Sequence, residues 1–186
     1  MILPIVAFGS TILRTKCVEI PADYPELESI LDNMKETMYE AHGVGLAAPQ
    51  INKAIRLFLI DTTPFLDDEE GVDAVIVKKV FINAKILKET GEEWSFNEGC
   101  LSIPNLREDV KRKPKITIEY MDENFKKHID TYDGLTARVI QHEYDHIEGI
   151  LFTDRISALR KKMIKGKLVD ISKGKVNVTY KMRFSR

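Results

Sequence analysis

The chain has 186 residues, 44% of them hydrophobic, which is enough to bury a core of ordinary size within one domain. Its 28 basic and 29 acidic residues leave a net charge of −1, so we expect neither a nucleic-acid partner nor an anionic membrane surface. No apolar run could cross a bilayer, the N-terminus lacks the features of a signal peptide, and two cysteines are too few for a secreted disulfide framework, so we expect a cytoplasmic location.

The predicted elements begin with an amphipathic helix over residues 25–41. Its apolar residues recur at spacings of three and four; they are Leu27, Ile30, Leu31, Met34, Met38 and Ala41. Segments of strand-like composition follow at 55–61, 75–82 and 116–120. Between the first two, residues 62–71 carry an acidic run and are expected to form a solvated hairpin tip.

A second helix is predicted over residues 135–148, because Gly149 occupies the position of a C-cap glycine. A short basic helix is expected at 156–165 and a final strand at 177–184. The strands precede the second helix and do not alternate with many helices. This order predicts an α+β fold with antiparallel sheets rather than a doubly wound parallel sheet.

The strongest local motif is His-Glu-Tyr-Asp-His at residues 142–146, within the second predicted helix. Residues four apart share one helical face, so the imidazoles of His142 and His146 can bind one ion. Glu143 then lies beside that ion, where it can take a proton from a water molecule. The alternative is a helix in which both histidines only pack or cap.

A catalytic metal site of this kind needs a third protein ligand and an open position for water. Downstream of the motif the chain has no histidine, although it has Glu148. His42 and His128 stand in contexts typical of surface or loop positions. Cys100 is the better candidate, although a lone cysteine is often only a small buried hydrophobic residue.

Three segments together resemble the motifs of the peptide deformylase family. They are Gly-Val-Gly-Leu-Ala-Ala-Pro-Gln at 43–50, Glu-Gly-Cys-Leu-Ser at 98–102 and Gln-His-Glu-Tyr-Asp-His at 141–146. They match the family in type, order and approximate separation. The resemblance implies that residues 1–186 form one catalytic domain, with antiparallel sheets packed around a central helix that carries the HExxH motif. It also implies a hydrolase that removes the N-terminal formyl group from formyl-methionine of new polypeptides.

The resemblance implies the metal site as well. Its ligands would be Cys100, His142 and His146, and one ferrous ion would be bound per chain. A mixed cysteine and histidine site would also hold Zn²⁺, Ni²⁺ or Co²⁺. Glu98 and Asp145 would hold ligands or neighbouring arginines in place.

The same resemblance assigns the residues that handle the reaction. Glu143 would be the general acid and base. The side-chain amide of Gln50 and the backbone N–H of Leu101 would stabilise the oxyanion. Without the motif, a surface amide would be the simpler reading of Gln50.

Five residues are implied to contact the substrate: Val44, Gly45, Arg107, Leu135 and Val139. Val44, Leu135 and Val139 would surround the methionine side chain, although each could equally be plain core. Gly45 would bring backbone close to the bound peptide. Arg138 stands where some members of the family have an apolar residue, which leaves one wall of this pocket open.

The expected partners are N-formylmethionyl peptides of nascent chains, met at the ribosome exit. Two alternatives stay open. An HExxH metallopeptidase that cleaves internal peptide bonds would need a downstream histidine or glutamate ligand. A non-catalytic binding module stabilised by a metal would tend to lack the glutamate that stands here as Glu143.

Overall fold

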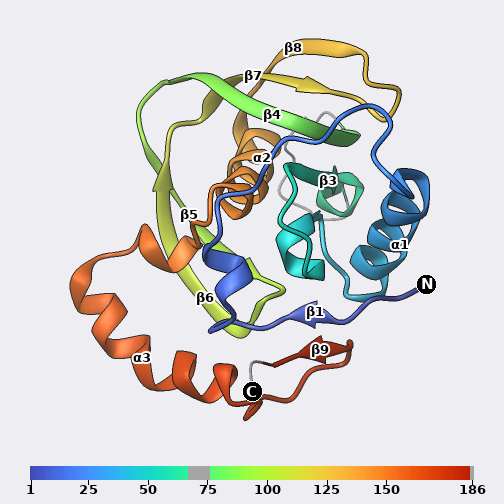
Figure 1. Ribbon diagram of the computed structural model, residues 1–186. Coiled ribbons are helices and arrows are strands. Elements are labelled where there is room, and N and C mark those ends of the chain that lie inside the picture. Colours follow the sequence, from blue (N-terminus) through green and yellow to red (C-terminus); the bar gives the residue numbers. More distant parts are fainter. Residues whose placement is uncertain (67–75, 185–186) are drawn as a thin grey trace.

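Three groups of strands lie around helix α2 in the computed structural model, which describes residues 1–66 and 76–184 (Figure 1). The helices and strands in chain order are β1 (Ile5–Val6), α1 (Leu27–Glu40), β2 (Gly45–Ala47), β3 (Leu57–Asp61), β4 (Lys78–Thr90), β5 (Trp94–Cys100), β6 (Ile103–Arg112), β7 (Lys115–Met121), β8 (Lys127–Tyr132), α2 (Gly134–Ile147), α3 (Ala158–Ser172) and β9 (Met182–Arg183). Short 3₁₀ helices are Thr11–Arg14, Ala48–Ile51, Thr63–Leu66 and Phe152–Asp154.

The largest sheet has five strands in the order β2-β3-β4-β7-β8, and every neighbouring pair in it is antiparallel. Strands β5 and β6 form a separate antiparallel hairpin, in which Cys100 is the register partner of Ile103. The predicted α+β class with antiparallel sheets is therefore confirmed. One small departure is the pairing of β1 with β9, which is parallel and joins the two ends of the chain.

Helix α2 lies between the five-stranded sheet and the β5–β6 hairpin, and its two faces differ in character (Figure 1). Ala137, Ile140 and Ile147 are completely buried and pack in one apolar cluster with residues of β3, β4 and β7. On the other face, Arg138 and His142 are four residues apart and both hydrogen-bond to β5. The apolar face therefore fixes the helix on the sheet, and the polar face directs Arg138 and His142 toward the hairpin.

The two amphipathic helices begin and end close to their predicted bounds. Gly149 follows the C-cap of α2 with φ +74°, as predicted for a C-cap glycine, and a Cβ there would lie 2.8 Å from the carbonyl oxygen of Arg14. The basic helix was predicted too short, since α3 runs on to Ser172. It stays attached through Ile164 and Ile171, which pack under β6.

The three predicted strands correspond to β3, β4 and β7, although β4 extends to Thr90. The final strand was predicted too long, because only β9 forms ladder hydrogen bonds. Residues 62–71 do lie between the antiparallel neighbours β3 and β4 in the sequence, but residues 67–71 of the predicted hairpin tip lie outside the described residues. Within the described part of the chain, no helix is long and apolar enough to cross a membrane.

Candidate metal centre and active site

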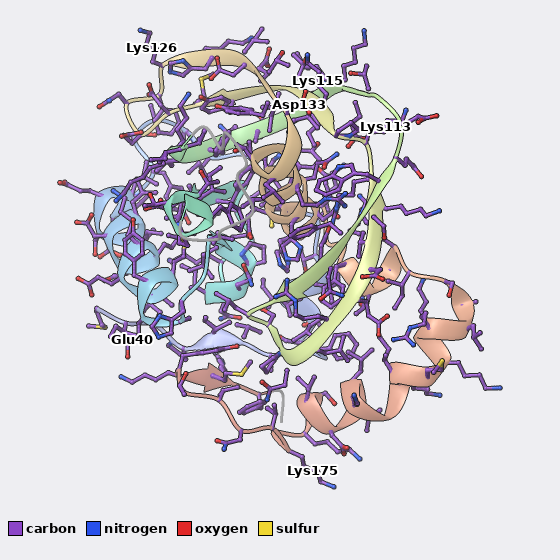
Figure 2. The ribbon with its side chains drawn as sticks, turned by 180° about the vertical axis from the view of Figure 1, so that it is seen from behind. Glu40, Lys113, Lys115, Lys126, Asp133 and Lys175 are labelled. Carbon is purple, nitrogen blue, oxygen red and sulfur yellow. The ribbon has the colours of Figure 1, made fainter. Side chains whose placement is uncertain are left out.

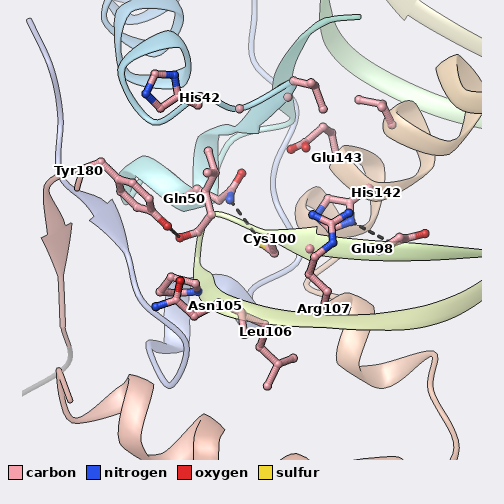
Figure 3. Close-up of a pocket in the computed structure, with 18 of the residues that line it drawn as sticks. His42, Gln50, Glu98, Cys100, Asn105, Leu106, Arg107, His142, Glu143 and Tyr180 are labelled. Atoms are coloured by element: carbon pink, nitrogen blue, oxygen red, sulfur yellow. Dashed lines mark hydrogen bonds and ion pairs between the residues drawn. The ribbon is translucent and has the colours of Figure 1, made fainter. Parts of the chain in front are cut away.

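The HExxH helix and the end of the β5–β6 hairpin bring together three possible metal ligands. The ligand atoms of Cys100, His142 and His146 all lie within 4.8 Å of one another. The Sγ atom of Cys100 is 3.3 Å from Nε2 of His146. Cysteine and histidine in a set of three match the ligand types and number of a catalytic site with one open position. The group predicted from the sequence is therefore assembled in space, and Figure 3 shows two of its members, Cys100 and His142.

The orientation of His142 also fits a metal ligand. Its Nδ1 lies 3.0 Å from Oε2 of Glu98, so the carboxylate holds a proton on Nδ1 and leaves Nε2 as the ring nitrogen that could bind an ion. His146 is 1% exposed, and its Nδ1 has no hydrogen-bond partner among the described residues. Its Nε2 is the nitrogen that faces Cys100 Sγ, at 3.3 Å, so this is the ring atom placed to bind an ion.

Glu98 is the centre of a buried charged network behind the ligands. It is 3% exposed and accepts two hydrogen bonds from Arg112, at 2.7 and 2.9 Å, and one from Arg138 at 3.1 Å. Burial alone would raise the pKa of Glu98, but the hydrogen bonds from Arg112 and His142 outweigh it and hold that pKa well below its usual range. The glutamate is therefore ionised and holds His142 in one tautomer.

Asp145 extends this network along α2. It accepts hydrogen bonds from Arg112 at 2.7 Å and from Arg155 at 2.6 Å, and it is 3% exposed. Arg112 therefore bridges the carboxylates of Glu98 and Asp145, and ties the hairpin to the helix that carries both histidines. The predicted supporting positions of Glu98 and Asp145 agree with these contacts.

Glu143 points into the same space with an uncommitted carboxylate (Figure 3). The side chain is 5% exposed, and its Oε2 has no hydrogen-bond partner in the described part of the chain. Burial raises the pKa of Glu143 to about 7, against a smaller lowering by His142. A carboxyl group with this pKa can both accept and donate a proton near neutrality.

Gly45 makes room for that carboxylate. A Cβ at residue 45 would lie 2.5 Å from Oε1 of Glu143 and 2.8 Å from its Cγ, closer than any side chain allows. The glycine was predicted to let backbone approach the bound peptide. In the structure its first neighbour is the glutamate, so an alanine at this position would displace Glu143.

Gln50 is held in one orientation. Its Oε1 accepts from the backbone N–H of Ala47 at 2.9 Å, which forces Nε2 to face Ser102 Oγ at 3.2 Å and Cys100 Sγ at 3.7 Å. The side chain is 2% exposed, so the reading of Gln50 as a surface amide is wrong. Leu101 directly follows Cys100 and begins the turn between β5 and β6, so its N–H lies next to the thiol-bearing residue in the chain.

A cavity of about 590 Å³ opens in front of these groups. Four of the five predicted substrate contacts line it: Val44, Gly45, Arg107 and Val139. Leu135 does not, because it lies one helical turn farther from Glu143 than Val139 does. Arg107 hydrogen-bonds through Nε to Oδ1 of Asn97, at 3.0 Å, beside the cavity.

Arg138 forms the part of the pocket wall whose nature the sequence did not decide. It is 2% exposed, and its guanidinium lies 4.5 Å from the ring centre of Trp94 while donating to the carbonyl oxygens of Trp94 and Val110. Phe96 also borders both the guanidinium and the cavity. The guanidinium of Arg138 is therefore paired with the Glu98 carboxylate and with carbonyl oxygens of the β5–β6 hairpin. This wall of the cavity consists of aromatic and aliphatic atoms and of one arginine whose charge is balanced by Glu98.

The remaining candidates lie elsewhere. Glu148 pairs with Arg56 and Lys16, so it is not available as a third ligand. His128 lies on β8 and contacts Asp122, whereas His42 is exposed at the rim of the cavity. Both histidines therefore agree with the predicted surface or loop positions.

Two residues of the site were missed from the sequence. Arg112 stands in the basic stretch 111–115, whose other lysines are exposed, and Lys113 and Lys115 project outward in Figure 2. Arg112 itself is 4% exposed and lies behind the metal ligands. Arg112 stands two residues after Val110, so on a strand both lie on the same face, and this spacing was the available signal. Tyr180, which lines the cavity from the C-terminal tail, has no sequence signal of its own.

Comparisons with known proteins agree with this geometry. The profile of the Polypeptide deformylase family matches residues 2–162. A peptide deformylase of Christiangramia forsetii is 62% identical over 189 residues, which cover 99% of this chain and 96% of that protein. The crystal structure of a peptide deformylase from Legionella pneumophila has a TM-score of 0.80 and 34% identity, covering 94% of this chain and 98% of the other. That of the peptide deformylase from Thermus thermophilus has a TM-score of 0.82 and 35% identity, covering 94% and 99%. The chain is therefore a member of the polypeptide deformylase family.

Proposed function

We propose that this chain hydrolyses the N-terminal formamide of N-formylmethionyl peptides, releasing formate and a free amine. The observation that carries the proposal is the buried Glu143 carboxylate, free on one oxygen, beside the ligand set Cys100, His142 and His146 at the mouth of a cavity. The names of the relatives support the same activity.

A ferrous ion is the proposed cofactor, and Cys100 Sγ and the Nε2 atoms of His142 and His146 would hold it. When bound, the ion acts as a Lewis acid that lowers the pKa of the attacking water and polarises the formyl carbonyl. Zinc, nickel and cobalt suit the same donor set, so the identity of the ion is part of the proposal.

The protons are handled by Glu143. Its carboxylate takes one proton from the water as the water oxygen attacks the formyl carbon. The C–N bond then breaks, its electron pair goes to nitrogen, and Glu143 returns the proton to the departing amine. A pKa near neutrality suits a group that must serve in both directions.

Negative charge develops on the formyl oxygen during the attack. The Nε2 amide of Gln50, oriented by Ala47, and the N–H of Leu101 are the proposed donors to that oxygen. Both donors are neutral and fixed before the substrate binds, so little reorganisation accompanies the reaction.

The methionine side chain would enter the cavity beside Val44 and Val139. The peptide backbone would lie along β2, which is the edge of the five-stranded sheet and pairs on one side only with β3 among the described strands. An extended peptide can add to such an edge by backbone hydrogen bonds.

The broader setting also remains a proposal. We assign residues 1–186 to one catalytic domain that acts in the cytoplasm, on nascent chains near the ribosome exit. The metallopeptidase alternative is less well supported, since the downstream Glu148 is engaged by Arg56 at 2.6 Å. A non-catalytic module would not require the free oxygen of Glu143.

The test is the release of formate from formyl-Met-Ala-Ser by protein purified without oxygen, with metal content measured in parallel. Glu143→Gln is the matched variant, because it keeps size and shape but cannot take the proton. We expect turnover by the wild type and a loss of about 10²- to 10⁴-fold in the variant at equal metal content. Cleavage of the Met-Ala bond, or full activity in Glu143→Gln, would overturn the proposal.

A further inference from the structure

The C-terminal tail forms one wall of the cavity. Residues 177–180 all line it, together with the β5–β6 turn that carries Cys100. This tail follows α3 and lies beyond the segment 2–162 that matches the family profile. The wall is therefore formed by a part of the chain outside that match.

The tail is fastened at both of its ends. The carbonyl of Lys181 accepts from the N–H of Ile5 at 2.9 Å, within the parallel pair of β1 and β9. The carbonyl of Asn177 accepts from Nδ2 of Asn105 on β6, also at 2.9 Å. Between these two points lies Tyr180, whose position is thereby set by strands on either side.

The hydroxyl of Tyr180 donates to the carbonyl oxygen of Leu101 at 2.7 Å (Figure 3). This bond is one of three from remote segments that converge on the two-residue turn 101–102. The N–H of Phe8 donates to the carbonyl of Ser102 at 2.9 Å, and Gln50 donates to its Oγ at 3.2 Å. The turn is thus held by the tail, by the N-terminal segment and by Gln50.

We propose that Tyr180 is a positioning residue that aims the N–H of Leu101 at the oxyanion. The inference rests on the proposed function, in which that N–H is one of two donors. The carbonyl that Tyr180 binds belongs to the peptide unit directly after the donating unit, so the bond fixes the rotation between the two units. Without it, the Leu101 amide keeps its place in the chain but loses its fixed direction.

Tyr180→Phe tests the proposal in the full-length protein, because it removes only the hydroxyl. We expect kcat for formyl-Met-Ala-Ser to fall about 3- to 10-fold with KM nearly unchanged, the rate equivalent of one neutral hydrogen bond. Tyr132→Phe is the matched control, since its hydroxyl contacts Asp130 on β8 at 3.2 Å and does not line the cavity. Metal content and melting temperature are measured for both variants.

A second readout does not depend on turnover. In the diamagnetic zinc-loaded protein, the amide of Leu101 is expected to exchange its hydrogen several-fold faster in Tyr180→Phe than in the wild type or in Tyr132→Phe. An inactive wild type with a faster Leu101 amide in the variant would refute the proposed function and keep the positioning role. An unchanged Leu101 amide, or a change confined to KM, would overturn the role of Tyr180.

Discussion

Replacing Glu98 by glutamine should break the hydrogen bonds that hold His142 and the two arginines behind the metal ligands, while leaving the volume of the side chain almost unchanged. In the structure Oε1 accepts from Arg112 Nε and Arg138, and Oε2 accepts from Arg112 and from His142 Nδ1. An amide presents one acceptor and one donor. Whichever way it turns, two of these four contacts place a donor against a donor.

The size of the effect follows from that count. A hydrogen bond to a charged partner is worth about 1.5 to 3 kcal/mol, and breaking a buried ion pair costs about 3 to 5 kcal/mol, so we expect the apo protein to lose about 3 to 5 kcal/mol. If the amide NH₂ faces His142, the imidazole proton moves to Nε2, the ligating nitrogen. Metal affinity should therefore fall by about 10- to 100-fold.

The assay is urea unfolding of the apo protein, together with competition for zinc against a chelator of known affinity. Glu108→Gln is the matched control: Glu108 is also buried on the hairpin, but its partner Arg160 is half-exposed and neither touches a metal ligand. The control should bind zinc like the wild type. If Glu98→Gln matched the control in both measurements, the supporting role assigned to this carboxylate would be wrong.

Four further predictions concern the site and the fold. Gln50→Ala should keep its metal, and its activity in steady-state kinetics should fall about 10²- to 10³-fold, mainly through kcat. A change in KM alone would contradict an oxyanion role for Gln50. Cys100→Ser should lower metal stoichiometry, whereas Cys17→Ser, at a buried thiol away from the site, should leave it unchanged. Activity of the iron form should decay in air through oxidation of Cys100, while a nickel form should persist, and equal lifetimes would argue against iron. Burial would raise the pKa of Asp61, but hydrogen bonds from Thr63 and from Tyr39 outweigh it and lower that pKa to about 2. The ionised Asp61 therefore stabilises the fold fully above the unfolded pKa, near 4, and this stabilisation is lost as the pH falls toward 2. Acid unfolding of Asp61→Asn should accordingly show a smaller loss of stability over that range.

The parts predicted well from the sequence are those with a local cause. The period of α1 and α2, the glycine after α2 and the spacing of the HExxH motif each depend on residues close together in the chain. The hairpin of β5 and β6 was missed because its buried positions include charges. Glu98 and Arg112 break the apolar alternation that marks a strand, and only the approach of α2 explains why they are buried.

The same reasoning explains the misplaced pocket residues. Leu135 shares a helical face with Val139, but the sequence does not show how far along that face the cavity extends. Arginine is a residue type usually found at the surface, and the burial of Arg138 depends on Glu98 and Trp94, which are far from it in the sequence. Contacts of this kind follow from tertiary packing and have no local pattern.

The pairing of β1 with β9 joins the first strand of the chain to the last. During synthesis β1 emerges from the ribosome long before β9, so this ladder joins segments far apart in the sequence and cannot form until β9 has emerged. The bond from Tyr180 to Leu101 is subject to the same delay. The HExxH helix and the β5–β6 hairpin can assemble earlier on a growing chain, but the cavity wall formed by residues 177–180 cannot close until those residues have been synthesised. The proposed active site is therefore incomplete on any nascent form of this chain in which Tyr180 has not yet left the ribosome.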